Sequence, residues 1–425
     1  MQTDSTKADK LSVCIIPERH TNDDPSASAF VRLLLPYASN PDLVENWSIT
    51  VSKKKELPDP STANIFIIER DVGGVDFDRI ANWLRKLREG GKKCVYELDD
   101  DFFNVEGLYQ RTGRNKANVK RTVDRAIWIA SAADAVVVST PQLYKLASKY
   151  NNNVFLLPNY LDPGLWGISE PQLSCSKKKR SIVKIGYVGT PTHNEDLMVI
   201  ADVMDKIKCE YGDQIEIEVI GAFQKDLDNP LFGKPIPLPK ARVYPKFVKW
   251  LRKQVDWDIA IIPLVDDIFN ESKSHLKFLE STALGLASIC SDVPTYSSIV
   301  KNNKNGILVN NNFEEWYQAI KFLIDNHEKR EELAQSAYSD LFEKYTTYTN
   351  SDLYHQMFVD VSALTTSPKV PPIKRSMKEY LIRYVAKSGS RNSRLCVKLL
   401  NDPYHYFLDS KHAFLRPVRV FFKKG

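Results

Sequence analysis

Residues 258–285 read Asp-Ile-Ala-Ile-Ile-Pro-Leu-Val-Asp-Asp-Ile-Phe-Asn-Glu-Ser-Lys-Ser-His-Leu-Lys-Phe-Leu-Glu-Ser-Thr-Ala-Leu-Gly. The apolar run at its start predicts a buried strand of a parallel sheet, and a polar loop separates this strand from a helix that we expect to begin near Ser272. A helix N-terminus attracts phosphate through its free backbone N–H groups and its dipole. The stretch therefore predicts a strand–loop–helix unit with an anion site at the loop.

Three charged residues of the expected helix share one face. Lys273, Lys277 and Glu280 are spaced by four and then three residues. Two cations beside a helix N-terminus suit a diphosphate, and a carboxylate two turns further along suits a ribose diol, because it can accept two hydroxyl hydrogen bonds. A surface helix with an ordinary Lys–Glu pair has the same spacing, so the spacing alone leaves both interpretations open.

Short apolar runs alternate with longer helical segments on both sides of this stretch, which predicts βαβ units and parallel sheets. A lysine-rich stretch at 174–181 is interpreted as a solvated linker between two such groups. We expect an N-terminal domain over residues 1–165, a second domain over 182–346, a helix over 347–366 that crosses back to the N-terminal domain, and an extension over 367–425. Ligands bind beyond the carboxyl ends of the strands in such sheets, so the deepest site is expected in a cleft between the two domains.

Composition and charge restrict the class of protein. Hydrophobic residues make up 43% and charged residues 26%, as in soluble globular chains, and the net charge of +6 is too small to argue for nucleic acid. The six cysteines show no metal-ligand spacing, so a reduced, cytoplasmic compartment is expected. The polar first ten residues predict no signal peptide, and no apolar run reaches the roughly 18 residues that a membrane span requires.

The stretch 263–285 resembles the donor domain of GT-B glycosyltransferases, above all the retaining, family-4-like enzymes of bacterial polysaccharide synthesis. Two further motifs add to the resemblance. Leu157-Pro-Asn-Tyr-Leu-Asp162 is similar to the element that closes the family's first domain, and Ile185-Gly-Tyr-Val-Gly-Thr-Pro-Thr-His193 is similar to the first strand and loop of its second. The resemblance implies an α/β GT-B fold: two Rossmann-like, doubly wound parallel-sheet domains that face each other across a cleft, plus a basic C-terminal extension.

The resemblance also implies an activity. A sugar would pass from a nucleotide-diphosphate sugar on the second domain to a glycan or lipid-linked acceptor on the first, in cell-surface polysaccharide synthesis and with retention of configuration. The departing phosphate would take the acceptor proton, and lysines would stabilise its charge, so we expect no metal and no cofactor. The expected catalytic residues are Lys273, Lys277 and Glu280. The residues expected at the donor are Gly186, Gly189, Thr190, His193, Asn270, Ser272 and Ser274.

The chain departs from the family's pattern in two places. The family usually has two glutamates separated by seven residues, but Ser272 stands at the first position and Glu271 is one residue out of register. The basic pair often seen at the start of the second domain is replaced by the residues 190–194. A catalytically inactive nucleotide-sugar-binding scaffold protein is therefore an alternative. His193 either caps a helix or contacts the donor phosphate.

Charged residues also follow the expected strands of the first domain. Asp99, Asp100 and Asp101 end one strand, and Glu18 and Arg19 follow another. We interpret them as acceptor-side residues that bind hydroxyl groups; a metal-binding DxD motif of the other glycosyltransferase fold and a purely structural turn are the other interpretations. In an inverting GT-B enzyme, one of these aspartates would be the general base.

The C-terminal extension is strongly basic. Residues 367–425 hold 14 Lys/Arg against 3 Asp/Glu, interleaved with aromatic residues. This combination suits an anionic membrane surface, and it equally suits an extension that packs on the acidic remainder of the chain. A nucleic-acid tail ranks third because no recognised binding module accompanies it. We therefore expect a cytoplasmic protein, with peripheral binding at the inner face of the cell membrane and packing of the extension on the body as the two alternatives for residues 367–425.

Overall fold

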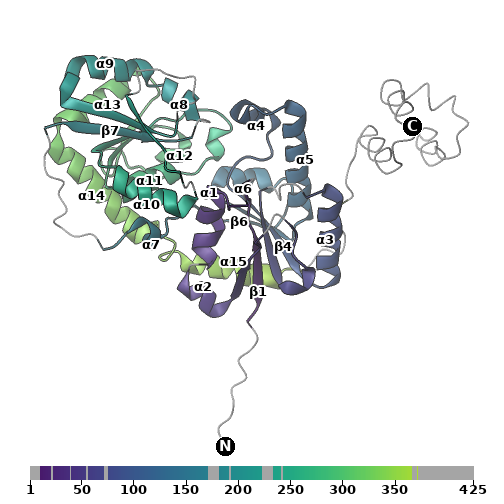
Figure 1. The fold of residues 1–425 in the computed structure, drawn as a ribbon. Helices are drawn as coiled ribbons and strands as arrows, with labels where there is room; N and C mark the ends of the chain where they lie inside the picture. Colours follow the sequence, from purple (N-terminus) through teal and green to yellow (C-terminus); the bar gives the residue numbers. More distant parts are fainter. Residues whose placement is uncertain are drawn as a thin grey trace, which may run out of the picture. The chain divides into compact units, whose positions relative to one another are not determined.

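The computed structural model describes residues 10–20, 23–38, 40–53, 56–70, 75–170, 181–190, 193–222, 233–240, 243–365 and 371 (Figure 1). The lysine-rich stretch lies almost wholly outside these residues, and the expected basic extension lies outside them except for Pro371. The two sheets described below belong to one compact unit.

The first sheet contains parallel strands in the order β2-β1-β3-β4-β5-β6. Its strands are β1 (Ser12–Ile16), β2 (Ser48–Val51), β3 (Ile65–Glu69), β4 (Lys93–Leu98), β5 (Ala135–Val138) and β6 (Val154–Leu156). Its helical segments are α1 (Ala27–Ala29), the π-helix η1 (Phe30–Ala38), α2 (Pro41–Asn46), η2 (Pro60–Thr62), α3 (Phe77–Glu89), α4 (Val105–Thr112), α5 (Lys116–Ala132) and α6 (Pro141–Ala147). Helix α7 (Pro163–Trp166) follows β6 and buries Leu165 and Trp166 in the core of the second sheet. The strand order reverses between β1 and β3.

The second sheet is also parallel, in the order β12-β11-β10-β7-β8-β9. Its strands are β7 (Val183–Val188), β8 (Ile215–Ile220), β9 (Lys234–Ile236), β10 (Ile259–Ile262), β11 (Ala287–Ser291) and β12 (Ile307–Val309). Its helical segments are α8 (Asn194–Met198), α9 (Ala201–Tyr211), η4 (Gly212–Gln214), α10 (Tyr244–Gln254), η6 (Asn270–Ser272), α11 (Leu276–Ala283), α12 (Pro294–Ser297), α13 (Phe313–Asp325) and α14 (His327–Lys344). This is the Rossmann order, and it reverses between β7 and β10, where such sheets bind ligands.

The burial of the strands explains why the sheets are parallel and covered on both faces. All residues of β5 and β10 are buried, as expected for continuous apolar runs in a doubly wound sheet. Amphipathic helices supply the cover: α3, for example, buries Ile80, Trp83 and Leu84. The prediction of two doubly wound parallel sheets is therefore confirmed.

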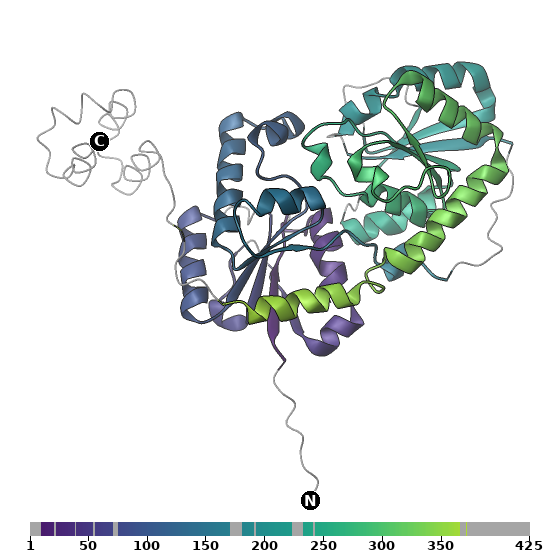
Figure 2. The same ribbon diagram turned by 180° about the vertical axis from the view of Figure 1, so that it is seen from behind.

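The chain returns to the first sheet after it has completed the second. Helix α15 (Ser351–Ala363) buries Tyr354 and Phe358 in the core that surrounds β1, β3 and β4. The ring of Tyr37 lies 5.1 Å from that of Tyr354 and 5.0 Å from that of Phe358. Figure 2 shows α15, in yellow-green, beside the purple and blue elements of the first sheet. No helix in the described ranges is both long enough and apolar enough to span a bilayer.

Candidate functional site

The candidate site lies at the carboxyl ends of β7 and β10, on either side of the point where the strand order of the second sheet reverses. Strand β7 leads to Gly189, Thr190 and His193, and β10 leads to a loop that ends at α11. We expected α11 to begin near Ser272, and this prediction is wrong. Residues 270–272 form a single 3-10 turn, and Lys273 has an extended backbone (φ −73°, ψ 149°). The helix begins at Leu276. Lys273 therefore precedes the helix and does not share a helical face with Lys277 and Glu280.

Lys277 is the first of two cations at the site. It lies in the first turn of α11, and its Nζ donates a hydrogen bond to the hydroxyl of Tyr187 over 2.8 Å. The same ammonium group lies 4.7 Å from the centroid of the Tyr187 ring. Burial, together with the neighbouring charge of Lys273, lowers the pKa of Lys277 to about 7. An anion beside this amine would restore its charge.

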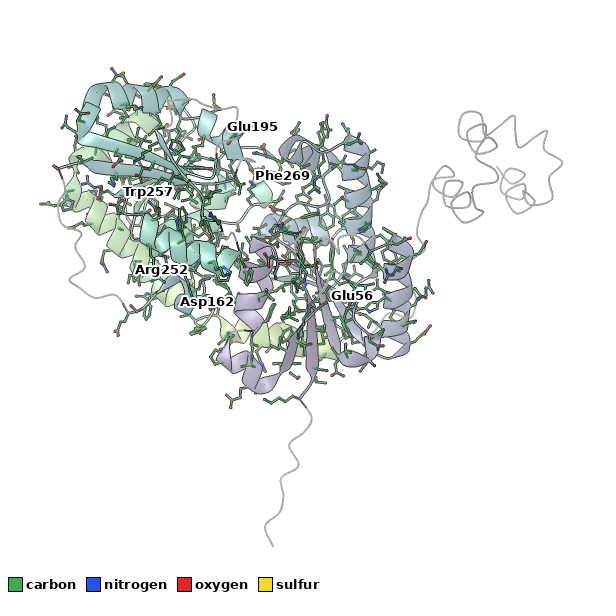
Figure 3. All side chains as sticks on the ribbon, viewed as in Figure 1. Glu56, Asp162, Glu195, Arg252, Trp257 and Phe269 are labelled. Carbon is green, nitrogen blue, oxygen red and sulfur yellow. The ribbon has the colours of Figure 1, made fainter. Side chains whose placement is uncertain are left out.

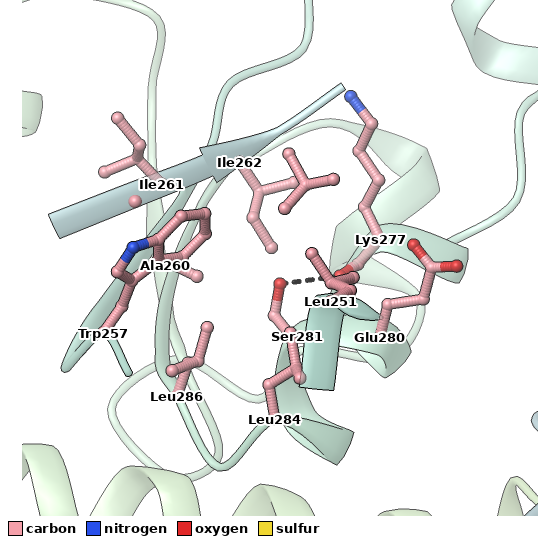
Figure 4. A pocket seen from close by; sticks show the side chains of 12 residues that line it. Leu251, Trp257, Ala260, Ile261, Ile262, Lys277, Glu280, Ser281, Leu284 and Leu286 are labelled. Carbon is pink, nitrogen blue, oxygen red and sulfur yellow. Dashed lines mark hydrogen bonds between the residues drawn. The ribbon is translucent and has the colours of Figure 1, made fainter. Parts of the chain in front are cut away.

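Glu280 lies one turn further along α11. Its Oε1 accepts a hydrogen bond from the hydroxyl of Tyr244 at 3.2 Å, and burial raises its pKa to about 7. Lys277 and Glu280 line a small, partly open pocket between α11, β7 and β10 (Figure 4). The other lining residues are mainly apolar and include Val188, Leu251, Trp257, Ile262, Leu284 and Leu286.

Lys273 and His193 form the second half of the site. The Nζ of Lys273 lies 3.4 Å from each ring nitrogen of His193. The Nδ1 of His193 lies 2.7 Å from Oδ2 of Asp196, which is fully buried and accepts the backbone N–H of Val265 on its other oxygen. Burial and the charge of Lys277 lower the pKa of His193 to about 3, so its imidazole is neutral. His193 stands at the N-cap position of α8, but its side chain makes no capping hydrogen bond.

Three polar residues expected at the donor lie in the loop between β10 and α11. Asn270 donates to the carbonyl of Val265, while its buried Oδ1 has no hydrogen-bond partner among the described residues. Ser272 is fully buried, and its hydroxyl likewise has no partner there. Ser274 accepts a hydrogen bond from Nδ2 of Asn159, at 2.7 Å. The structure thus places these expected donor residues in one loop, with Ser274 directed at the first domain.

The two glycines of β7 and its loop serve side-chain packing. A Cβ at Gly186 would lie 1.9 Å from ring atoms of the buried Trp257, so this glycine accommodates the indole, whereas we expected it to let the donor approach. A Cβ at Gly189 would lie 2.5 Å from the ring of Tyr187, which holds Lys277. Thr190 is exposed at the end of the same strand.

On the first sheet, Arg70 gathers the expected acceptor-side carboxylates. Its guanidinium contacts Asp99 at 2.5 Å, Asp100 at 2.8 Å and Glu18 at 3.3 Å. Burial raises the pKa of Asp100 to about 6, and the charge of Arg70 opposes this shift. The arginine thus lies between the adjacent Asp99 and Asp100, whereas Asp101, the second aspartate of the DxD spacing, makes no ion pair with it. Within the described ranges, no group of three or more His, Cys, Asp or Glu is placed to bind a metal ion.

Two other expected acceptor-side residues have local structural partners. Asp101 is buried and accepts the backbone N–H of Phe103 at 2.9 Å. Arg19 donates to the carbonyl of Asp23 at 2.6 Å and to that of Ser52. Both side chains stabilise the turns in which they lie.

The loop between β10 and α11 also joins the two sheets. Thr140 donates to the carbonyl of Ser272 at 3.0 Å, and Gln142 donates to Glu271 at 3.2 Å. Phe269 packs with Leu108 of α4 and with residues of α5 (Figure 3). Residues from both sheets therefore support the site.

Several residues of the site could not be inferred from the sequence. Tyr187 and Tyr244 position the predicted Lys277 and Glu280, and Arg70 organises the predicted aspartates. Asp196 follows His193 by three residues, a spacing that places two side chains on one helical face and could have indicated the pair.

Comparison with known proteins finds a family match within the elements of the second sheet. Residues 276–340, from α11 into α14, match the family model of glycosyl transferases group 1, and no curated protein matches the sequence. Sucrose-phosphate synthase from Thermosynechococcus elongatus is 12% identical, with 83% of this chain and 100% of that chain covered and a TM-score of 0.55. HepE from Anabaena in complex with UDP-glucose is 11% identical, with coverage of 82% and 100% and a TM-score of 0.54.

TarM from S. aureus is larger than this protein. It is 14% identical with a TM-score of 0.46, and the match covers 70% of this chain but only 55% of TarM, about half of its length. The architecture shared with sucrose-phosphate synthase and HepE is the GT-B fold, as the sequence predicted.

Proposed function

We propose that this GT-B chain, whose residues 276–340 carry the glycosyl transferases group 1 sequence, moves a sugar from a nucleotide-diphosphate sugar to a glycan or lipid-linked acceptor. The second sheet binds the donor at the ends of β7 and β10, and the first sheet binds the acceptor at the ends of β1, β3 and β4. HepE, which shares the fold, was solved with UDP-glucose, so UDP-glucose is the first donor to test.

The observation that carries this proposal is the placement of two half-buried lysines at the switch point of the second sheet, Lys273 against His193 and Lys277 against Tyr187. Burial lowers the pKa of both Lys273 and Lys277, and the charge of Lys273 lowers that of Lys277 further. Like charges held together out of water are unfavourable unless an anion joins them. A diphosphate supplies two or more negative charges and would bind both amines.

The same placement supports a reaction with retention and without a metal. As the bond between the anomeric carbon and the phosphate oxygen breaks, negative charge grows on the diphosphate, and Lys273 and Lys277 stabilise it. The acceptor hydroxyl then attacks from the face that the phosphate leaves, and its proton passes to the departing phosphate oxygen. Glu280 binds the ribose hydroxyls, and neutral His193 offers a ring nitrogen to the donor.

One observation favours a second mechanism. Asp100 is partly exposed, and its pKa of about 6 suits a general base near neutral pH. An inverting enzyme of the same fold would use such a base on the acceptor hydroxyl. The anomeric configuration of the product, read by proton NMR, distinguishes the two mechanisms.

Cell-surface polysaccharide synthesis on the cytoplasmic face of the membrane is the proposed setting. An acceptor that is lipid-linked would be presented there, and the basic residues 367–425 would add attraction to anionic lipid. Deletion of residues 367–425 should then weaken sedimentation with anionic vesicles and leave donor binding intact.

A transfer assay with EDTA present tests the proposal. UDP-glucose and other nucleotide sugars are incubated with the full chain and a mixture of glycan and lipid-linked acceptors, and release of nucleoside diphosphate is followed. Release that depends on the acceptors is the expected result. Donor binding without transfer to any acceptor would favour the alternative of a catalytically inactive scaffold protein, which the serine at position 272 suggested.

A further inference from the structure

Arg111 reaches from the first sheet's helices to the candidate site. It lies in the last turn of α4, and its side chain is only 7% exposed. Its NH2 group donates to Oδ2 of Asp267 at 2.6 Å, in the loop that follows β10. Its NH1 group lies 3.9 Å from a carboxylate oxygen of Asp196 and equally far from one of Glu195, both in α8. One guanidinium thus reaches both the loop that follows β10 and the helix that follows β7.

Arg111 also shares two neighbours with Lys273. The oxygen of Asp196 that faces Arg111 is the one bound to His193, and the amine of Lys273 lies 3.4 Å from that histidine ring. The ring of Phe269 lies 5.9 Å from the guanidinium carbon and 5.8 Å from the Lys273 amine. Arg111 and Lys273 therefore lie at one place, and Lys277 is close enough that the charges of both lower its pKa.

Four carboxylates face these three cations, and they differ in exposure. Asp196 is fully buried, whereas Asp267 and Asp100 are partly exposed and Glu195 is largely exposed. The loop that follows β7, residues 189–194, contributes no lysine or arginine of its own. An anion with several oxygens would relieve the repulsion among the cations, and a guanidinium can bind two of those oxygens at once.

We propose that Arg111 is a third cationic ligand of the donor diphosphate, supplied by the first sheet's helix α4 to a site whose lysines belong to the second sheet. This inference rests on the proposed function. Its consequence is that a bound diphosphate joins the two halves of the chain, because it would be held by α4 from one side and by α11 from the other. Asp267 is then the counter-ion of Arg111 in the absence of the donor, and the diphosphate takes its place.

A purely structural ion pair between Arg111 and Asp267 is the competing explanation, and one pair of variants distinguishes it. If the pair only holds α4 against the loop, Arg111→Ala and Asp267→Asn break the same contact and have the same effect. If Arg111 binds the diphosphate, Asp267→Asn leaves it free to do so, and only Arg111→Ala weakens binding. Arg114, which is exposed and lies three residues further along the chain, is the matched control as Arg114→Ala.

The test is calorimetric titration of the full chain with UDP, GDP and ADP, with melting temperature as the check on folding. We expect Arg111→Ala to bind the preferred diphosphate 10- to 100-fold more weakly, and Asp267→Asn and Arg114→Ala to bind it within about threefold of the wild type. If Arg111→Ala does not fold, Arg111→Lys is the variant to test. It should bind the diphosphate severalfold more weakly, because lysine keeps the positive charge but lacks the planar guanidinium that binds two oxygens at once.

Unchanged affinity in the folded arginine variant, or equal losses in Arg111→Ala and Asp267→Asn, would overturn this inference alone. A wild-type chain that binds none of the three diphosphates would overturn the proposed function and this inference with it.

Discussion

The ammonium group of Lys277 donates to the hydroxyl of Tyr187 at 2.8 Å and lies 4.7 Å from the centroid of the same ring. Tyr187 belongs to β7 and Lys277 to α11, so the contact fixes a helix side chain against the strand beside which the sheet's order reverses. Gly189 is part of this arrangement, because a side chain there would collide with the Tyr187 ring. The cation is thereby held in place before any ligand arrives, as electrostatic stabilisation of a transition state requires.

This placement predicts different kinetic effects for two neighbours on α11. Lys277→Ala should lower turnover by roughly 30- to 1,000-fold, about 2–4 kcal/mol, because the diphosphate becomes more negative as the sugar departs. Glu280→Gln should mainly weaken donor binding, by about 1–3 kcal/mol, because the ribose hydroxyls do not change during the reaction. Steady-state kinetics test the split, with the exposed Lys249→Ala as a control. Near-normal turnover and donor binding in both variants would show that the catalytic site does not include α11.

The pH dependence of donor binding should follow Lys277. Because the pKa of this buried amine is about 7, most of the unliganded protein holds it neutral at pH 8. A bound diphosphate favours the charged form, so binding at pH 8 should take up close to one proton, and affinity should fall as the pH rises from about 7 to 9. Titration in two buffers of different ionisation enthalpy measures the uptake. Lys277→Met should abolish it, and equal binding enthalpies for the wild type in both buffers would contradict the prediction.

The aspartates after β4 should separate into two roles. Asp100→Asn should lower transfer by roughly 10- to 100-fold with little change in donor affinity, because its side chain is partly exposed at the acceptor side beside Arg70. Asp101→Asn should instead destabilise the fold by about 1–2 kcal/mol, because its buried carboxylate accepts the N–H of Phe103. Thermal melting and transfer rates on both variants provide the comparison. Loss of donor affinity in Asp100→Asn would contradict the prediction, because it would show that Asp100 contacts the donor and not the acceptor.

Gly186 should tolerate no side chain. The methyl of Gly186→Ala would lie 1.9 Å from the Trp257 ring, and that ring is fixed by burial and by the hydrogen bond from its Nε1 to Glu218 at 2.6 Å. Overpacking usually costs about 1–3 kcal/mol, and a loss at or above the upper end is expected here. Gly90→Ala is the matched control, since its methyl would come no closer than 3.4 Å to any atom. Similar stability of the two variants in urea would show that β7 and Trp257 can separate easily.

The sequence predicted most of the fold because the buried strands are continuous apolar runs with clear breaks. Strand β9 has no such pattern in the sequence, because it is three residues long, contains Pro235 and is mostly exposed. Helices α8 and α9 are separated by only two residues, and neither has a side-chain cap that would mark its start. These features are decided by tertiary packing more than by local pattern.

Less of the site was predictable, for the same reason. Lys277 and Glu280 were identified from spacing and resemblance, but the groups that hold them come from distant positions: Tyr187 lies 90 residues before Lys277, and Tyr244 lies 36 before Glu280. Arg111 and Asp267 are 156 residues apart, so no local pattern connects them. The prediction that Lys273 shares a helical face with Lys277 was wrong for a local reason. The 3-10 turn at 270–272 ends before the helix begins, so Lys273 lies outside the helix.

Binding of a nucleoside diphosphate to wild type and Lys277→Ala, compared by calorimetry at pH 7, tests the central claim most directly. The account predicts that one of UDP, GDP or ADP binds the wild type with a stoichiometry of one, that Lys249→Ala binds it equally well, and that Lys277→Ala binds it less tightly. Binding of the same diphosphate to Lys277→Ala with unaltered affinity and unaltered proton uptake would contradict the account, because the diphosphate would then lie away from α11.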